Sequence, residues 1–486
     1  MNERIRHESV VFATIGVLLA SNACAVGPRY RRPDLPAPPA FSEAPPDGWK
    51  DAQPNDDAPR GKWWSVYGEP GLDALEDQVS ISNQNVLAAE ARFRAAKAAV
   101  RVTRAGQFPT VTTTPSVTGS GTGAESGVQR RYEIPIDVTY EADIWGSIRR
   151  SVAANAAVAQ ASAADLENAR LLYQAELAAD YFQLQGLGAE ERLLDATVQS
   201  YEQYLQLTKN RYEGGVASMG DVALAETQLE TARAQLVDLG IPRAQFEHAI
   251  AVLMGKPPSV VSMPAATTQP LPPPVLVGLP STLLERRPDI AAAERQVAAA
   301  NEQIGVAKAA FYPSLTFSGS ASSQAAAIVE LLAVPTRIWS VGAELAETLF
   351  DGGRRRAQVT LTQAAYDATV ANYRQTVLTG FQQVEDGLAE LRILSQEAEV
   401  VARAVAAAQQ SLDIAAIQYR GGLASYLQVI TAQTSLLQNQ RATVDIQTRR
   451  LIASVSLIQA LGGGWDASQL PSTQDVRRSA NGPGEH

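Results

Sequence analysis

The feature that most constrains this chain is an internal duplication. The stretch RYEGGVASMGDVALAE, residues 211–226, returns as QYRGGLASYLQVITAQ, residues 418–433. Tyr212 and Tyr419 lie 207 positions apart (419 − 212), and the residues that recur at the same offset include Gly214, Gly215, Ala217, Ser218 and Val222. A chain built from two copies of one unit must form each of its elements twice. The duplication predicts a tandem repeat, with residues 71–278 as the first copy and 279–464 as the second.

Each copy reads as helix, strand, strand, helix. Apolar residues alternate with polar ones through RYEIPIDVTYEADIW, where Ile136 and Val138 share one face and Asp137 and Thr139 the other. Such alternation predicts a strand with one apolar and one wet face. A membrane crossing takes about 9–11 tilted residues, and a half-buried strand of a soluble sandwich is the alternative for this segment alone. The predicted strands cover residues 110–121, 132–145, 314–323 and 339–350.

Four strands per chain cannot close a barrel in lipid, because the smallest membrane barrels have about eight. Open strand edges are not tolerated in hydrocarbon, so several chains must contribute. Three chains would supply twelve strands (four times three). The long helical runs 147–214 and 354–421 each cover 68 positions, which at ~1.5 Å per residue reach about 100 Å. In the first run, QGLGAE at residues 185–190 is the candidate break.

A turn of the same design ends each long helix. Gly214 and Gly215 end the first helix and Gly421 and Gly422 the second, as glycines that accept left-handed geometry. A serine with a polar residue three positions later then resembles a capping box, Ser218 with Asp221 and Ser425 with Gln428. The returning helices, residues 221–255 and 428–462, are half as long. Each turn is therefore the tip of a helical hairpin, at the opposite end from the strands, with tips at residues 212–221 and 419–428.

The N-terminus of the chain carries a targeting signal. Residues 1–23 read as a lipoprotein signal peptide, with an apolar run from Val10 to Ala20 that is too short to span a bilayer. Cys24 is the one cysteine of the chain, and at the cleavage site it is best explained as a lipid attachment point. Ser21 departs from the leucine usual at that position. Residues 24–70 are expected to be an extended proline-rich segment and residues 465–486 a flexible tail.

The composition argues against several function classes. The formal net charge of −10 argues against nucleic acid as a partner, because nucleic acid requires a basic stripe and none is expected in this chain. The three histidines, His7, His248 and His486, have no helical spacing for a metal site. No catalytic constellation or cofactor motif is present, so the chain is predicted not to be an enzyme. The non-enzyme alternatives are a periplasmic lipoprotein adaptor and a coiled-coil scaffold without a pore.

At this point the chain resembles the TolC-like outer-membrane efflux protein family, in its lipoprotein (NodT/OprM-like) branch. The residues that carry the resemblance are CAVGPRYRRP, KWWSVYGEPGLDAL, EADIWGSIRRSV, RYEGGVAS and, most specifically, LLERRPDIAAAERQVAAANEQIGVAKAAFYPSL at residues 283–315. The resemblance implies a mixed fold, a membrane β-barrel continued by a long α-helical barrel. It implies a homotrimer with a twelve-stranded barrel in the outer membrane and a twelve-helix tunnel through the periplasm.

The resemblance also implies a function. The family forms the passive exit duct of tripartite efflux pumps, which exports drugs or other small molecules and is opened by a periplasmic adaptor and an inner-membrane transporter of the RND type. The tip residues Gly214, Gly215, Val216, Gly421, Gly422 and Leu423 are the candidate adaptor-docking surface, because a turn tip that repeats an apolar residue in both copies is unusual for a soluble surface. The gate candidates are Tyr212, Asp221, Tyr419 and Gln428. Gln428 replaces an expected carboxylate, and Asp221 has a second reading as a helix cap.

Overall fold

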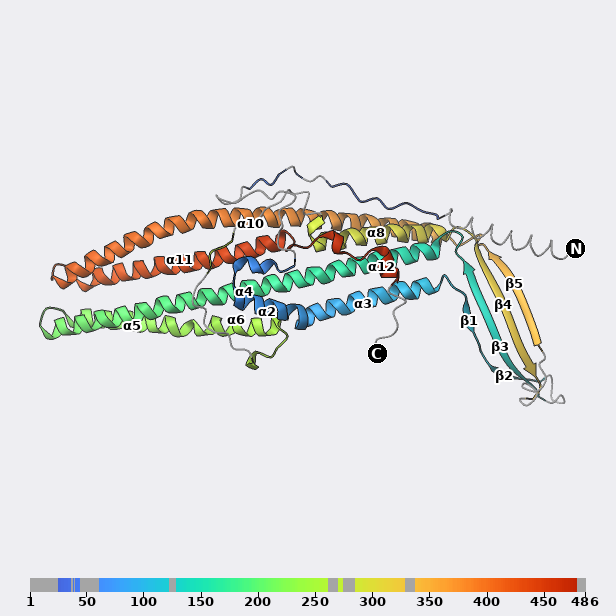
Figure 1. Ribbon diagram of the computed structural model, residues 1–486, viewed down its shortest axis with the longest axis horizontal. Helices are drawn as coiled ribbons and strands as arrows, with labels where there is room; N and C mark the ends of the chain where they lie inside the picture. Colours follow the sequence, from blue (N-terminus) through green and yellow to red (C-terminus); the bar gives the residue numbers. More distant parts are fainter. Residues whose placement is uncertain are drawn as a thin grey trace.

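The computed structural model describes residues 25–35, 38, 40–43, 61–121, 128–260, 270–273, 285–327 and 337–478. It is an elongated molecule with a sheet at one end, the turns of two helical hairpins at the other and shorter elements around its middle (Figure 1). The signal segment, Cys24, His7 and His486 lie outside the described residues.

The first copy contains the elements that the duplication predicts, with different ends. After a 3-10 helix, η1 (Trp63–Tyr67), its elements are α2 (Pro70–Ser82), α3 (Gln84–Ala105), β1 (Thr110–Thr112), β2 (Ser116–Ser120), β3 (Gln129–Ala142), α4 (Ser147–Glu213), α5 (Met219–Asp238), α6 (Gly240–Leu253) and η2 (Pro258–Val260). The returning helix, predicted as one, is divided at Leu239 into α5 and α6.

The second copy repeats this order. Its elements are α8 (Pro288–Ala309), β4 (Ser314–Ala325), β5 (Arg337–Ala346), α10 (Arg354–Arg420) and α11 (Tyr426–Ala460), followed by η3 (Ala467–Gln469) and α12 (Thr473–Arg478). Both long helices, α4 and α10, have 67 residues, and both begin after a glycine with positive φ, Gly146 at 82° and Gly353 at 91°. The duplication is therefore visible in the helix lengths and in the conformation at which the helices begin.

The strands form one antiparallel sheet in the order β1-β3-β4-β5, with β2 also paired to β3. The strand predicted at 110–121 is split into β1 and β2, although both keep one register against β3. Pro115 would lie opposite Ile134 in that register, and Pro135 of β3 opposite Thr114. Because a proline has no N–H to donate, the ladder is interrupted at these positions.

Two strands end earlier than predicted. β3 stops at Ala142 and β5 at Ala346, whereas the alternation suggested residues 145 and 350. After β3 the carboxylate of Asp143 accepts hydrogen bonds from the backbone N–H groups of Ile148 and Arg149 at 3.0 and 2.8 Å. After β5 Asp351 accepts from those of Gly353 and Arg355 at 2.9 and 3.1 Å. These carboxylates satisfy the first free donors of α4 and α10, which requires the chain to turn there.

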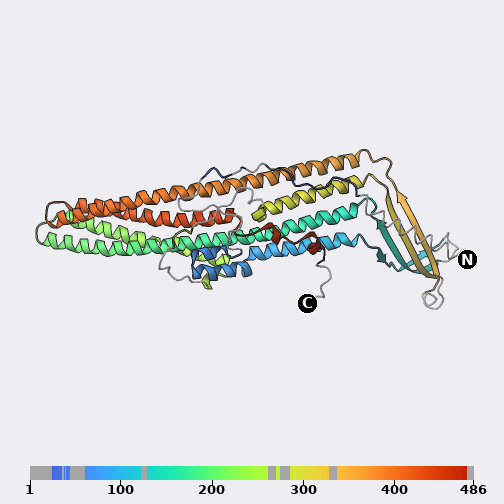
Figure 2. The same cartoon turned by 45° about the horizontal axis from the view of Figure 1, so that its top comes forward.

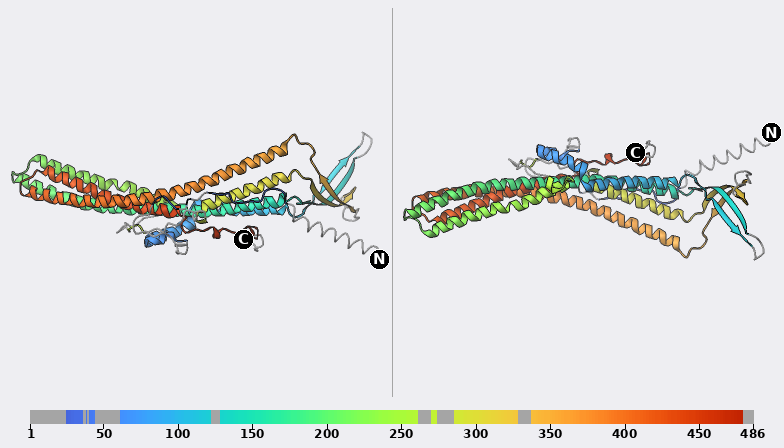
Figure 3. Two further views of the ribbon diagram at one scale, coloured as in Figure 1. Left: turned by 90° about the horizontal axis from the view of Figure 1, so that it is seen from above. Right: turned by 90° about the horizontal axis from the view of Figure 1, so that it is seen from below.

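The helices continue the sheet in the same order. Toward the sheet, α3, α4, α8 and α10 lie side by side in one curved layer (Figure 2), and their contacts join α3 to α4, α4 to α8 and α8 to α10. Toward the tips the contacts join α5 to α4, α4 to α11 and α11 to α10. As α10 approaches the sheet, it moves gradually away from the other three helices of the layer (Figure 3). The layer has two free edges, one at α3 and α5 and the other at α10.

The candidate break in α4 is a site of close helix packing. The helix runs without interruption through Gly186, and a Cβ atom there would lie 3.0 Å from Cγ2 of Thr448 on α11 and closer still to its hydroxyl. The glycine therefore lets α4 and α11 approach more closely than any side chain would allow. It is a contact surface, not a helix end.

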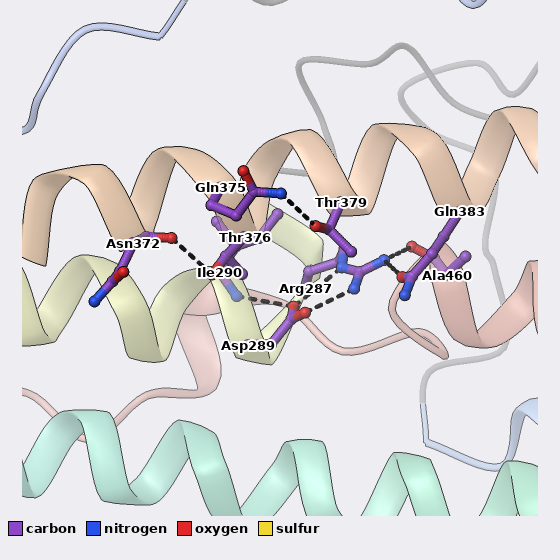
Figure 4. Close-up of polar contacts among 9 residues, drawn as sticks. All are labelled: Arg287, Asp289, Ile290, Asn372, Gln375, Thr376, Thr379, Gln383 and Ala460. Atoms are coloured by element: carbon purple, nitrogen blue, oxygen red, sulfur yellow. Dashed lines mark hydrogen bonds and ion pairs between the residues drawn. The ribbon is translucent and has the colours of Figure 1, made fainter.

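The most specific sequence motif, LLERRPDI, fastens the beginning of α8. The guanidinium of Arg287 binds the carboxylate of Asp289 and donates to Oε1 of Gln383 on α10 at 2.8 Å and to the carbonyl of Ala460 on α11 at 2.9 Å (Figure 4). In the first copy, Asn83 donates to the carbonyl of Leu253 at 2.9 Å. Leu253 and Ala460 are 207 positions apart (460 − 253), so each copy uses a different side chain to hold the same joint.

The two terminal segments pack against the helices. At the N-terminus, Tyr30 donates to Glu294, Arg32 donates to Tyr373, and Glu43 pairs with Arg392. At the C-terminus, the expected flexible tail is wrong for residues 465–478. Trp465 is buried beside Ala164, Ala291 and Ala292, and Val476 is buried beside Val100 and Val152. Burial of these large apolar side chains fixes the segment, a gain of about 1.5–3 kcal/mol for each.

Substituting Gly186 tests the packing of α4 on α11. Gly186→Ala should lower the apparent unfolding temperature, because overpacking costs about 1–3 kcal/mol, more than the helix propensity of alanine returns. The double variant Gly186→Ala/Thr448→Ala should recover most of the loss in thermal unfolding of the detergent-extracted protein. Gly240→Ala is the control, since a Cβ atom there meets nothing within 4 Å. A stabilised single variant would contradict the packing role.

Candidate functional site

The two hairpin turns share one backbone design. In the first, Gly215 has φ 73°, and the N–H of Val216 donates to the carbonyl of Arg211 at 2.8 Å. In the second, Gly422 has φ 74°, and the N–H of Leu423 donates to the carbonyl of Gln418 at 2.8 Å. The left-handed glycine lets the chain reverse while the last carbonyls of each helix keep a partner.

The two turns differ in how the returning helix begins. Ser218 and Asp221 form a complete capping box: the Ser218 hydroxyl accepts from the Asp221 N–H, and the Asp221 carboxylate accepts from the Ser218 N–H. Ser425 makes no side-chain cap, so the box predicted with Gln428 is wrong. A carboxylate is a stronger acceptor for a backbone N–H than a neutral amide, and Gln428 is instead exposed.

Apolar side chains project from both turns. Val216 is 66% exposed and Leu423 85% exposed. Met219 and Leu427, which occupy the first turns of α5 and α11, are exposed as well. The candidate docking residues therefore lie at an uncovered apolar surface of the protomer, which is the kind of surface that a protein partner covers.

Tyr419 holds the two turns together. It is only 3% exposed, and its hydroxyl lies 3.1 Å from Oγ1 of Thr208 on α4. The guanidinium of Arg211 lies over its ring, 4.8 Å from the centroid, and donates to the carbonyl of Arg420 at 3.0 Å. Both contacts of Arg211 cross from the first hairpin to the second, so one side chain joins the tips by a cation–π contact and a hydrogen bond.

A tyrosine cluster extends this contact. The ring of Tyr426 lies 5.3 Å from that of Tyr419, and Tyr201 is buried in the same cluster. Burial, more than the neighbouring tyrosines, raises the pKa of the Tyr426 hydroxyl. Tyr212, the counterpart of Tyr419 in the first copy, is 46% exposed and outside the cluster. The gate candidates are therefore not equivalent: Tyr419 and Asp221 are held by neighbours, whereas Tyr212 and Gln428 are exposed.

Sequence reasoning missed Arg211, Thr208 and Tyr426. The positions 207 residues from them hold Gln418, Ala415 and Met219, so a search for recurring residues passes over all three. The sequence signal that could have found them is that each of these residues differs from its counterpart in the other copy. A large aromatic or charged residue in one copy only, next to a shared turn, marks a contact between the copies and not within each.

The sheet supplies a second functional surface. Residues that are opposite each other in the registers share a face, and one face is apolar across the strands, with Val111, Ile134, Ile136, Val138, Tyr140, Phe317, Trp339, Val341 and Leu345. The other face carries Asp137, Glu141, Ser320, Ser340 and Glu344. Most of the apolar side chains are exposed in the protomer. Both edges of the sheet, β1 with β2 and β5, are unpaired by another described strand.

Comparison with known proteins gives these surfaces a context. Residues 75–256 and 279–463 match the family described as outer membrane efflux protein. The chain is 30% identical over 460 residues to the toluene efflux pump outer membrane protein TtgC of Pseudomonas putida, covering 91% of this chain and 93% of that protein. It is 31% identical over 461 residues to the outer membrane protein OprJ of Pseudomonas aeruginosa, covering 93% and 95%. A crystal structure of CusC superposes with a TM-score of 0.83 at 25% identity, over 91% of this chain and 100% of that one.

Removing the Arg211 side chain should loosen the contact between the two turns. A cation–π contact at an exposed site contributes about 0.5–1 kcal/mol and a hydrogen bond about 0.5–1.5 kcal/mol. Arg211→Gln should therefore raise the population of separated tips about 5–70-fold. Spin labels at Glu213→Cys and Ala424→Cys would report a broader and longer distance distribution. Lys209→Gln on the same helix is the control, and an unchanged distribution in Arg211→Gln would contradict the role of Arg211.

Proposed function

Because the chain belongs to the outer membrane efflux protein family and matches it through both copies of its repeat, it is an outer-membrane exit duct of an efflux system, and we propose that three copies of it build that duct. The family consists of channel proteins of efflux systems and not of enzymes. Relatives that match 91% of the chain are named as efflux pump outer membrane proteins, which supports passage of small molecules to the outside as the function.

The observation that carries the trimer proposal is the open, two-faced sheet. Its apolar face suits lipid and its polar face an aqueous lumen, but its two unpaired edges leave backbone groups that hydrocarbon cannot satisfy. Pairing β5 of one copy with the β1 and β2 edge of the next removes the edges. β1 and β2 pair with the same strand, β3, in one register, so they count as two segments of one strand. Each copy then contributes four strands, and three copies give a twelve-stranded barrel.

The helices support the same closure. The helical layer has its edges at α3 and α5 on one side and α10 on the other, in the order of the strands to which these helices connect. α10 contains a stretch long and apolar enough to cross a membrane, of which 17% is buried. In a closed ring this uncovered apolar surface faces the neighbouring copy, and the four helix positions of each copy make a twelve-helix tunnel.

We further propose that the tips are the inner end of the duct. The exposed apolar residues Val216 and Leu423 offer a docking surface to a periplasmic adaptor, and an inner-membrane transporter of the RND type supplies the cargo. Tyr419, fixed by Arg211 and Thr208, sets the resting position of the second hairpin. Tyr212 and Gln428 are the exposed gate candidates, whereas Asp221 is engaged in its capping box.

The N-terminal segment supports the proposed lipid anchor. The N–H of Val26 donates to the carbonyl of Trp145 at 3.1 Å, and Trp145 stacks on Tyr312, where the strands join the helices. These aromatic rings suit the membrane–water interface. Ala25 thus lies at the end of the sheet that joins the helices. An acyl chain on the residue before it would enter the periplasmic leaflet of the outer membrane.

The face assignment of the sheet can be tested with two arginines. Val138→Arg should cost about 2–4 kcal/mol near the middle of the barrel wall, because its side chain faces hydrocarbon, while Asp137→Arg should cost far less. The measurement is the yield of heat-modifiable trimer in outer-membrane fractions. The two neighbours are matched in position on β3 and differ in face, so equal losses would refute the assignment and with it the barrel.

The tips can be tested without disturbing the barrel. The double variant Val216→Asp/Leu423→Asp should assemble and insert normally but abolish pump-dependent resistance, since charged side chains at the tip oppose burial against an adaptor. Cysteines at the two positions should crosslink to the adaptor. Val237→Asp is the matched control, an apolar residue that is 79% exposed away from the turns. Full resistance of the double variant at normal protein level would remove the tips from the docking surface.

The anchor predicts covalent acylation at Cys24. Radiolabelled palmitate should be incorporated into the natural chain and not into Cys24→Ser, and label that persists in the variant would exclude this attachment point. The barrel itself holds the protein in the membrane, so Cys24→Ser is expected to retain at least part of the transport activity.

A further inference from the structure

The expectation that the chain has no basic stripe is wrong for α3, where a basic surface lies near the end of the helix that meets the sheet. α3 carries five cationic residues, Arg92, Arg94, Lys97, Arg101 and Arg104, and one acidic residue, Glu90, in a chain whose net charge is −10. Four of these cations gather with two from α4 and α12, and together they define the basic surface: Arg94, Lys97, Arg101, Arg104, Arg149 and Arg477.

The C-terminal helix α12 organises this surface. Val476 is buried between α3 and α4, against Val100 and Val152, and the cations flank it on both sides. Toward the sheet, a cavity of about 380 Å³ is lined by Arg104, Gln107, Arg149, Val152, Gln474 and Arg477. Away from the sheet, a second cavity of about 230 Å³ is lined by Arg94, Lys97, Arg101 and Val476.

Little negative charge balances these cations. Arg149 is paired with Asp143 at 3.2 Å, and Arg104 donates to the carbonyl of Arg477 at 3.0 Å. Across the described part of the chain, no salt bridge includes Arg94, Lys97, Arg101, Arg104 or Arg477. The nearby carboxylate of Asp475 accepts from the N–H and hydroxyl of Ser472. The surface is therefore positive and open to an anion.

The duplication shows that the fold does not require these cations. α8 occupies the place of α3 in the second copy, and its bounds are those of α3 shifted by 204 positions (309 − 105), so Ala298, Asn301 and Gly305 stand where α3 has Arg94, Lys97 and Arg101. Of the stripe on α3, only Arg104 has a cationic counterpart, Lys308. The equivalent helix α8 thus forms in the same architecture without the basic stripe, so the stripe of α3 is not needed for folding.

The position of the surface identifies the anion. α3 ends at Ala105 and β1 begins at Thr110, so Arg101 and Arg104 lie within about 6 Å of the helix end at ~1.5 Å per residue. The polar headgroup layer of a bilayer is about 5–7 Å thick on each side. α12 lies on the side of the helical layer away from α10 (Figure 3), and its Val476 is buried between α3 and α4. The surface around it therefore lies over the groove between these two helices, on a face of the layer.

We propose that the basic surface binds the phosphate groups of anionic phospholipids in the periplasmic leaflet of the outer membrane. The cavity between Arg104, Arg149 and Arg477 receives the headgroup, and the exposed side chains of Val102 and Phe108 lie beside the acyl region. Arg94 and Lys97 lie about 16 and 12 Å from the helix end at ~1.5 Å per residue, beyond the Debye length of about 8 Å at physiological salt, so their contribution is largely screened. This inference rests on the proposed function, because it requires the sheet to lie in the membrane.

The test compares lipid retention by the full-length acylated trimer. Arg104→Gln/Arg477→Gln removes two charges from the cavity. The amide of the new Gln at position 104 can still donate to the backbone carbonyl of residue 477. Each cation near an anionic surface contributes ~1 kcal/mol, so binding of phosphatidylglycerol in detergent, measured by native mass spectrometry, should weaken about 30-fold. Lys209→Gln/Arg403→Gln is the matched control, with the same change in net charge on the long helices away from the sheet, and should bind as the natural chain does.

Three further arms separate the sources of the anion. Phosphatidylcholine should bind about equally to the natural chain and both variants, and inorganic phosphate at 10 mM should not displace phosphatidylglycerol from the natural chain. Raising the salt should weaken phosphatidylglycerol binding to the natural chain. Equal lipid binding by the two double variants, or full displacement by inorganic phosphate, would overturn the proposal.

The same samples show whether the proposed function has failed instead. Both double variants should give heat-modifiable trimer in the outer-membrane fraction at the level of the natural chain. Normal trimer together with unchanged phosphatidylglycerol binding in Arg104→Gln/Arg477→Gln refutes the lipid site alone. Absence of membrane-inserted trimer from the natural chain itself would refute the duct, independently of any lipid measurement.

Discussion

Every backbone donor and acceptor within a bilayer must find a partner in the protein, and this requirement organises the whole molecule. Each unsatisfied group in hydrocarbon costs several kcal/mol, so the two free edges of the sheet determine what the chain can become. Pro115 and Pro135 show the requirement locally. They fall on neighbouring strands within the same short interruption of the ladder. Because both missing N–H donors are at this one place, the ladders on either side of it keep the same register.

The sheet in turn sets the arrangement of the helices. Each strand continues into a helix at the same position in the layer, and Asp143 and Asp351 turn the chain from strand to helix while they satisfy the first free N–H groups. The order of the strands is thereby passed to α3, α4, α8 and α10. In the trimer that we propose, a contact that closes the sheet between two copies would bring the helical edges together as well, so one closure would produce both the barrel and the tunnel.

The sequence alone predicted the parts that depend on local pattern. The duplication, the alternation of the strands and the glycine pairs indicated the sheet, two helices of nearly the observed length and both turns. It failed where partners distant in sequence decide the structure. Gly186 looked like a break because its neighbour Thr448 was unknown, and residues 465–478 looked mobile because the groove that buries Val476 is built from α3 and α4. The Arg211–Tyr419 contact joins the copies and leaves no repeated signature.

The differences between the two copies are therefore as informative as their likeness. Both copies must fasten the end of the returning helix, and they do so with different residues. Asn83 and Arg287 donate to equivalent carbonyls at the joint of each hairpin. Where only one copy has a feature, the architecture has shown that it folds without it. Arg211, the exposed Gln428 and the basic stripe of α3 are such features. Two of these features lie at the tips, which we propose as the docking end of the duct, and one lies at the sheet end, which we propose to contact lipid. These three differences between the copies therefore fall at the two ends of the molecule.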